Sequence, residues 1–289
     1  MESTNKIEIS KNKIKNKTTL DQIVKVAFTF IAMICASVII VIVAFIFIEG
    51  LKPFFTNYEI NGINYRPGFF PFVFGLSWEA SPYQYGIGFI IINTLYVTLC
   101  SLLIAVPISV LTSLFIVRIA PKFLSKALNY VIELLASIPS IIYGVFGAGV
   151  ITNIVKNLAN LFNYQSAGGV STLATIIVLA MMIIPTITLI SITSIKTVKE
   201  DYIKGSLALG ASPTQTNFKV VLTSAKSGIF SGIILGVGRA LGEATAVTMV
   251  AGNATSGPTF NLFDITRTLT STMLANIKET SGLSYDIRF

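Results

Sequence analysis

The sequence has no histidine, two cysteines, one tryptophan and few charged residues. The lack of histidine excludes imidazole catalysis and removes the commonest protein ligand for transition metals. Cys35 and Cys100 both lie inside apolar runs, where cysteine behaves as a small hydrophobic residue. They predict neither a disulfide framework nor a metal site, and we expect no bound cofactor.

Charged residues make up only 12% of the 289 residues, and 53% are hydrophobic. Soluble domains carry about 25% charged residues, so the shortage predicts an integral membrane protein. Five apolar runs reach the length of about 20 residues that a spanning helix needs. They lie at 24–48, 87–117, 129–152, 171–195 and 228–250. No run shows sustained polar–apolar alternation, which favours an all-α, polytopic transmembrane bundle over a barrel.

The net charge of +8 is unevenly distributed between the connections. Six lysines fall within residues 1–25, three basic residues separate the second and third runs, and five separate the fourth and fifth. By contrast, 49–86 holds only two basic residues and 153–170 only one. Cytoplasmic loops are enriched in Lys and Arg, so this asymmetry predicts a cytoplasmic N-terminus. The charge is therefore an orientation signal, and we expect no nucleic-acid partner.

Two segments outside the runs differ in composition. Residues 1–22 are polar and rich in Lys and Asn, which predicts a disordered or loosely surface-bound cytoplasmic tail ahead of a transmembrane domain over 23–289. The external segment 50–86 is dense in Phe, Tyr, Pro and Gly. Aromatic residues favour the membrane–water interface, and Pro and Gly prevent a long helix. This segment is either an aromatic belt against lipid or a docking surface for an external partner.

Three of the apolar runs contain an internal proline, at Pro107, Pro139 and Pro185. Each proline removes one backbone hydrogen bond and is expected to bend its helix. Bent helices are common in bundles that enclose a pathway, although a single proline in a membrane helix is weak evidence by itself.

The fifth run contains two rows of glycines with a spacing of four. The rows are Gly228, Gly232 and Gly236, and Gly238 and Gly242. Small residues at this spacing let neighbouring helix backbones approach closely. We therefore expect this helix to be central and surrounded by protein.

Two ionisable residues, Arg239 and Glu243, lie within the same run. Unpaired in lipid, they would cost about 5–7 kcal/mol, so they must face protein, each other or a polar cavity. Their spacing predicts that both lie on one helix face, where they could form an internal ion pair. We favour a pathway role over a purely structural pair, because the planar donor fork of Arg239 suits tetrahedral oxyanions. Glu133, one turn inside the third run, is expected to reach the cytoplasmic interface instead.

The cytoplasmic connection at 200–228 is too long for a tight turn. Gly210, followed by Ser212 and Pro213, predicts a short helix, a turn and a second helix. This segment either caps the bundle or enters a cytoplasmic partner. The sequence contains no GxxxxGK[ST] loop, so transport would be driven by an ion gradient or by a separate ATPase.

The stretch SLALGASPTQTNFKVVL resembles the cytoplasmic coupling motif of ABC importer permeases, which is Glu-Ala-Ala, then Gly, then Leu-Pro. Lys204, Gly205 and Ser206 stand at the Glu-Ala-Ala positions, so the acid of the motif is absent. Gly210 matches the glycine, Leu222 matches the leucine, and Thr223 replaces the proline. The resemblance implies that ATPase coupling falls to the segment 200–215, with the residues Lys204, Gly205, Ser206, Leu207, Ala208, Gly210 and Ala211.

Further stretches resemble the phosphate importer permeases of the PstC type over about 70–285: LSWEASPYQYG, LLIAVPISV, IELLASIPSIIYGVFG and GRALGEATAVTMVAGN. The resemblance implies a type I ABC importer permease in a bacterial plasma membrane, without an ATPase site of its own. Its implied partners are a PstA-type permease subunit, two copies of a cytoplasmic ATP-binding subunit and an external phosphate-binding protein. It associates Arg239 and Glu243 with phosphate passage. The family has six spanning helices, and this sequence ends where the sixth is expected.

Four other functions remain open at this point. The chain could be the PstA-type subunit, a permease for sulfate or molybdate, a secondary anion transporter or channel, or a membrane scaffold. A channel has no need of the coupling-like segment 200–215, and a scaffold leaves Arg239 and Glu243 unexplained.

Overall fold

The computed structural model describes the backbone of residues 2–60, 62–80 and 83–289, and side chains from residue 21 onward except at 60, 61, 63, 81 and 82. The chain divides into two compact units. The first comprises the residues up to Arg66 together with Phe289, and the second is Pro67–Arg288. Among the described residues, five helical segments are long and apolar enough to cross a membrane, which confirms the predicted fold class. These segments are Asp21–Phe55, Gly88–Ile119, Ser140–Leu161, Thr172–Lys196 and Pro213–Gly242.

The first unit consists of one long helix and a small hairpin. Helix α1 spans Glu2–Phe55, and the antiparallel strands β1 (Tyr58–Ile60) and β2 (Ile63–Tyr65) follow it. Helix α1 therefore includes residues 2–22 of the segment for which we expect a polar cytoplasmic tail. This stretch contains neither glycine nor proline, so nothing in its local sequence ends the helix that the apolar run propagates.

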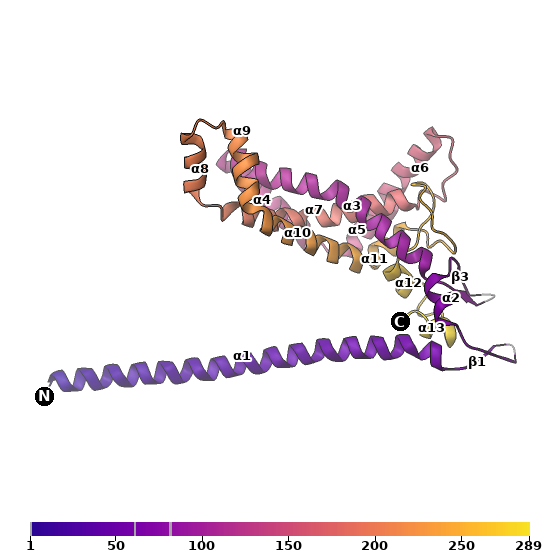
Figure 1. Ribbon diagram of the computed structural model, residues 1–289, viewed down its shortest axis with the longest axis horizontal. Helices are drawn as coiled ribbons and strands as arrows, with labels where there is room; N and C mark the ends of the chain where they lie inside the picture. The colour runs from indigo at the N-terminus through magenta and orange to yellow at the C-terminus, as the bar shows by residue number, and fades with distance from the viewer. Residues whose placement is uncertain (1, 61, 81–82) are drawn as a thin grey trace. The chain divides into compact units, whose positions relative to one another are not determined.

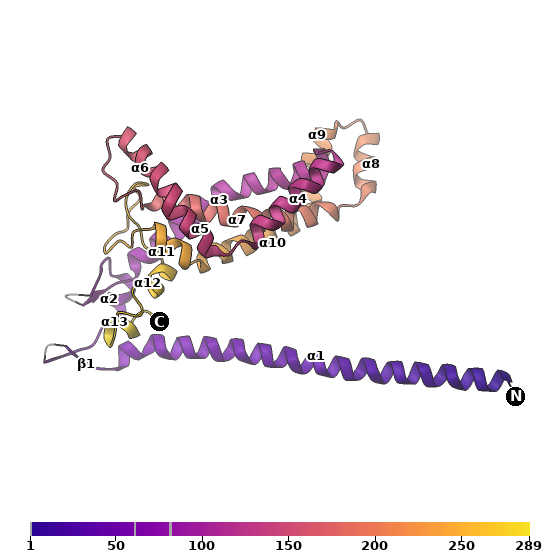
Figure 2. The same cartoon turned by 180° about the vertical axis from the view of Figure 1, so that it is seen from behind.

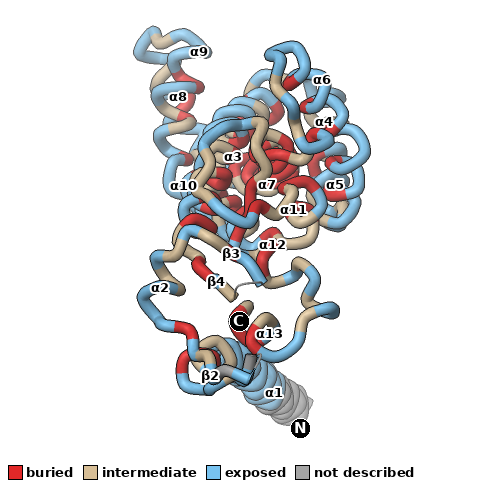
Figure 3. The backbone as a smooth tube through the Cα atoms, turned by 90° about the vertical axis from the view of Figure 1, so that its right-hand side faces the viewer, coloured by how far each residue is buried: buried red, intermediate tan, exposed pale blue. Residues whose placement is uncertain are grey.

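The core of the second unit is built around α7 (Thr172–Lys196), which packs against both α3 (Gly88–Leu114) and α10 (Leu222–Gly242). Buried residues gather where α3, α7 and α11 (Thr245–Val250) meet (Figure 3). Serine hydroxyls link the helices there. Ser101 of α3 donates a hydrogen bond to the carbonyl of Ile176, and Ser109 donates one to the carbonyl of Ile184, each with a donor–acceptor distance of 3.1 Å. Such interhelical hydrogen bonds are typical of membrane bundles.

The third apolar run is divided at Pro139. Helix α4 (Lys122–Ser137) ends before it, and α5 (Ser140–Phe146), the π-helical turn η2 (Gly147–Ile151) and α6 (Thr152–Leu161) follow (Figure 2). The segment that can span is therefore Ser140–Leu161, and the span expected at 129–152 was misplaced. Proline forces the residue before it out of the helical region, and Ile138 is extended with ψ 127°.

The prolines consequently differ in role. Pro107 and Pro185 lie inside α3 and α7 as expected, but Pro139 precedes α5 and separates two helices instead of bending one. Glu133 is exposed on α4 and accepts a hydrogen bond from Asn129.

Short elements occupy the two ends of the second unit (Figure 1). At one end are α8 (Glu200–Ala208), α9 (Pro213–Gln215) and the π-helical turn η3 (Thr216–Val221). At the other end are α2 (Phe69–Phe74), β3 (Trp78–Glu79), β4 (Gln84–Tyr85), α11, α12 (Leu269–Leu274) and α13 (Leu283–Asp286). From the charge asymmetry we expect the α8 end to face the cytoplasm and the other end to face outward.

Candidate functional site: an open groove at Arg239

The two glycine rows of α10 face different surroundings. The packed glycine row, Gly228, Gly232 and Gly236, lies directly against α7. A Cβ added at Gly236 would lie 2.8 Å from Cγ2 of Ile183, closer than real Cβ contacts. This confirms the predicted close approach. The open glycine row, Gly238 and Gly242, has no described atom of this chain within 4 Å of an added Cβ, so the chain itself leaves this side of α10 bare.

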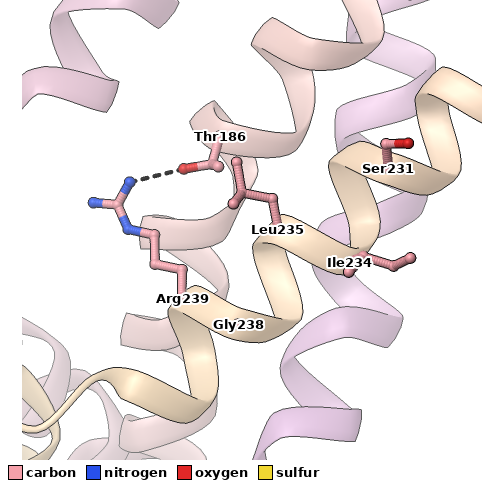
Figure 4. Close-up of a pocket in the computed structure, with 6 residues that line it drawn as sticks. All are labelled: Thr186, Ser231, Ile234, Leu235, Gly238 and Arg239. Atoms are coloured by element: carbon pink, nitrogen blue, oxygen red, sulfur yellow. Dashed lines mark hydrogen bonds between the residues drawn. The ribbon is translucent and has the colours of Figure 1, made fainter. Parts of the chain in front are cut away.

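An open groove of about 500 Å³ follows this bare side of α10 (Figure 4). Its wall is mostly apolar, with three polar side chains set into it. The lining residues are Thr186, Ser231, Ile234, Leu235, Gly238 and Arg239. Inside a membrane, a groove with such a wall strengthens the interaction between a bound ion and the few polar groups that face it.

The side chain of Arg239 reaches from α10 to α7 within this groove (Figure 4). Its Nη1 donates a hydrogen bond of 2.7 Å to the hydroxyl of Thr186. Among the described residues, no carboxylate forms an ion pair with Arg239. A guanidinium carries five N–H donors in a fixed fork. The arginine is therefore held by a neutral hydroxyl and keeps both its charge and further donors for a ligand.

Glu243 has a different role from the one its spacing predicts. Helix α10 ends at Gly242, and Glu243 is extended with φ −77° and ψ 113°. Its Oε1 accepts a hydrogen bond of 3.0 Å from the backbone N–H of Ala246, and the residue is only 9% exposed. The carboxylate thus satisfies one of the free N–H groups that begin α11. The predicted same-face placement was wrong, because the helix does not continue through Glu243, and the alternative of an internal ion pair does not form among the described residues.

The short helix, turn and second helix predicted within 200–228 are confirmed. Helix α8 ends in a turn at Gly210, whose φ of +87° favours glycine. The N–H of Gly210 donates to the carbonyl of Leu207, and that of Ala211 to the carbonyl of Ser206, which is the Schellman pattern. Helix α8 is anchored by the buried Ile203 and by a 2.9 Å hydrogen bond between the hydroxyls of Ser206 and Thr216.

The remaining coupling residues of α8 face solvent. Lys204, Gly205, Leu207 and Ala208 are exposed, and Leu209, just after the helix, is 91% exposed. Exposed leucines beside a fixed turn form a surface that suits docking to another protein. The coupling residues and Arg239 belong to consecutive elements of the chain. Helix α8 is followed by the turn at Gly210, by α9 and η3, and then by α10, which carries Arg239 near its far end (Figure 1).

Sequence reasoning did not identify Thr186 or Ser231 as lining residues. Both are small hydroxyl residues in apolar helices, where most such side chains bond to their own helix backbone. The available signal was the position of Thr186 directly after Pro185, within a run that also contains several other threonines. That signal does not single out one residue.

These features together define a polytopic membrane protein of the permease class: five segments able to span, a cationic groove on a helix, and a projecting helix–turn–helix at the end that the charges place inside. The chain belongs to the family of binding-protein-dependent transport system inner membrane components. The model of that family matches residues 105–277, more than half of the chain. It is thus a multi-pass component of the cell membrane.

Curated relatives cover most of the chain. A probable ABC transporter permease protein, YqgH of Bacillus subtilis, is 33% identical over 86% of this chain and 76% of its own length. The phosphate transport system permease protein PstC of Pasteurella multocida is 34% identical over 74% of this chain and 71% of its own. Among solved structures, a chain of the MetNI methionine ABC transporter is 20% identical, with a TM-score of 0.46 over 70% of this chain and 84% of that one.

Proposed function

We propose that this chain is the permease subunit of an ATP-driven importer of inorganic phosphate. The observation that carries the proposal is Arg239, which extends into an open groove without a carboxylate partner among the described residues. An arginine remains charged at every physiological pH, so the groove attracts an anion. The name of the PstC relative supports phosphate as that anion.

The groove would form one side of the anion passage. Because it is open along α10, a second membrane subunit is needed to close it, and a PstA-type permease is the partner that we propose. In the closed passage, the fork of Arg239 would bind two oxygens of the anion while Thr186 orients the guanidinium. The buried carboxylate of Glu243, held at the start of α11, would tune the field at this site without neutralising the arginine.

The energy would come from a separate cytoplasmic ATPase. The sequence has no phosphate-binding loop of its own, and the segment 200–215 offers exposed apolar residues at the predicted cytoplasmic end. We propose that α8 docks into one of two copies of an ATP-binding subunit. The Schellman turn at Gly210 would fix the angle between α8 and α10, so that movement of α8 reaches the groove.

An external binding protein would deliver the phosphate. In the second unit, the outward end carries exposed phenylalanines of α2, with Phe70 73% and Phe74 72% exposed. Aromatic residues are enriched in the cores of protein interfaces. This arrangement supports the docking interpretation of the external segment 50–86, although lipid contact would use the same side chains.

Uptake by the complete complex in proteoliposomes tests the proposal. We expect ATP-dependent accumulation of labelled phosphate that requires the binding protein. Preferred uptake of sulfate or molybdate would make the chain a permease for another oxyanion. Uptake without ATP would indicate a secondary transporter or channel, and the proposal would then fail.

A further inference from the structure

A second arginine, Arg267, lies between α11 and α12, outside the groove. It is only 8% exposed, and its Nη2 donates a hydrogen bond of 2.9 Å to the carbonyl of Asn253. Its Nε is buried and has no hydrogen-bond partner among the described residues. Native proteins pair nearly all of their buried polar groups, so an unpartnered guanidinium N–H indicates a missing partner.

Three other buried polar atoms without a partner belong to the same region: Thr266 Oγ1, Asn253 Oδ1 and Asn93 Nδ2. Thr266 precedes Arg267 in the chain, and Asn253 accepts its hydrogen bond. Asn93 lies in the first turns of α3, and the segment 253–269 packs on these turns. Asn93 Oδ1 accepts a hydrogen bond from the N–H of Thr259, and Thr94 Oγ1 accepts one from the N–H of Leu269. The four atoms without a hydrogen-bond partner therefore lie on two segments of the chain that are in contact with each other.

The charge around Arg267 is also uncompensated. Burial, and then the positive charge of Arg288, lowers the pKa of Arg267 to about 10, so it is still a cation at neutral pH. Arg288 uses its own N–H groups on the carbonyls of Thr272, Ala275 and Ser284. Neither arginine forms an ion pair with a carboxylate in the described part of the chain. A buried charge without a counter-charge is costly, so an anion would stabilise this region.

We propose that Arg267 and Arg288, with Thr266 and Asn253, form a second oxyanion site at the outward end of the bundle. Arg267 Nε and the Thr266 hydroxyl would donate to the anion. Asn253 Oδ1 is an acceptor, so the ligand must also carry a proton, which phosphate has near pH 7 and sulfate lacks. Asn253 and Arg288 are partly exposed, whereas the unpartnered atoms of Asn253, Thr266 and Arg267 are buried just beneath them, so the anion would replace the protein contacts that now cover these atoms.

This inference rests on the proposed function, since the site would receive the phosphate that later passes Arg239. The same segment is joined to the end of α10: the hydroxyl of Thr270 donates a 2.8 Å hydrogen bond to the carbonyl of Glu243. An anion that moves Arg267 would therefore act on the junction of α10 and α11, beside the groove.

Equilibrium binding of labelled inorganic phosphate to the complex of permease and ATP-binding subunits in nanodiscs, without the external binding protein, tests the second site. The Arg239→Gln complex, which lacks the groove cation, is expected to bind phosphate still, with sulfate competing at least tenfold more weakly. Adding Arg267→Gln should weaken phosphate binding at least tenfold. Adding Lys278→Gln, which removes an exposed charge from the same external segment, should change it less than twofold.

Loss of all phosphate binding in Arg239→Gln alone, or unchanged binding after Arg267→Gln is added, overturns the inference. If the complex with Arg267→Gln does not assemble, Thr266→Val replaces it as the test. This substitution keeps the shape of the side chain and removes the unpartnered hydroxyl, and we expect phosphate to bind about threefold more weakly. Unchanged affinity would then overturn the site and leave a carboxylate of a partner subunit as the counter-charge. Failure of the proposed function gives a different result: wild-type proteoliposomes would then show no ATP-dependent phosphate uptake.

Discussion

The guanidinium of Arg239 donates a 2.7 Å hydrogen bond to the hydroxyl of Thr186, and this contact joins α10 to α7 at the wall of the groove. A hydroxyl orients an arginine without cancelling its charge, whereas a carboxylate would do both. The arrangement therefore separates two requirements of an anion passage: a fixed geometry for the cation and a charge that is still available to the substrate.

Replacing Arg239 with Gln should abolish phosphate uptake while the complex assembles normally, because the residue is partly exposed in an open groove and supports no core packing. Arg239→Lys should restore only part of the uptake, since Lys lacks the planar fork. Thr186→Val should lower uptake by about tenfold, as expected for loss of one hydrogen bond to a charged group worth about 1.5 kcal/mol. Normal transport by Arg239→Gln would place the passage elsewhere.

Two substitutions at Glu243 separate its charge from its hydrogen bond to Ala246. Glu243→Gln keeps a side-chain oxygen for that N–H, so the melting temperature of the purified complex should hardly change, while uptake slows and sulfate is excluded less well. Glu243→Leu removes the acceptor and should destabilise the protein by about 1–2 kcal/mol, the cost of losing a helix cap. Equal melting temperatures for the two variants would show that the cap contributes nothing.

The packed and open glycine rows predict opposite effects of the same substitution. Gly236→Ala forces a methyl group against Ile183 and Ile187 and should cost about 1–3 kcal/mol through overpacking. Gly238→Ala meets no described atom and should stabilise the helix by about 0.5–1 kcal/mol. Thermal unfolding of the two variants in the same detergent measures the difference. A stable Gly236→Ala protein would contradict the packing of α10 on α7.

Gly210→Val should weaken coupling between ATP hydrolysis and uptake. A β-branched residue at φ +87° is strained by about 1 kcal/mol or more, so the turn after α8 would change its conformation. The matched control is Gly168→Val, which introduces a similar strain at φ +69° in the loop between α6 and α7, outside the coupling segment, with no described atom within 4 Å of the added Cβ. The number of phosphates transported per ATP hydrolysed is measured for both. If the two variants give the same ratio, the geometry of this turn does not set the coupling.

The features that the sequence predicted are those that depend on local pattern. The length of the apolar runs predicted five segments able to span, and Gly210 with Ser212 and Pro213 predicted a helix, a turn and a second helix within 200–228. The packed glycine row also followed from its spacing of four. Each of these is a pattern within one continuous segment of the chain, so one sequence is sufficient to find it.

The features that the sequence did not predict depend on competition between local and tertiary contacts. The end of α10 at Gly242 places Glu243 where the free N–H of Ala246 binds its carboxylate, and a spacing of four alone favours a continuous helix. The third run was misplaced because hydropathy does not register the break at Pro139. Arg267 stands in a polar stretch of the sequence, and only the packing of that stretch on α3 shows that the arginine is buried.

The open glycine row makes the width of the groove independent of the stability of the fold. Side chains of increasing size at Gly238 would narrow the groove step by step, since no described neighbour opposes them, while Arg239 would keep its charge and its contact with Thr186. If the groove carries the anion as we propose, the size limit of the passage is adjustable apart from its charge preference. Substitution at a single position that the packing of this chain does not constrain would then change which oxyanion fits.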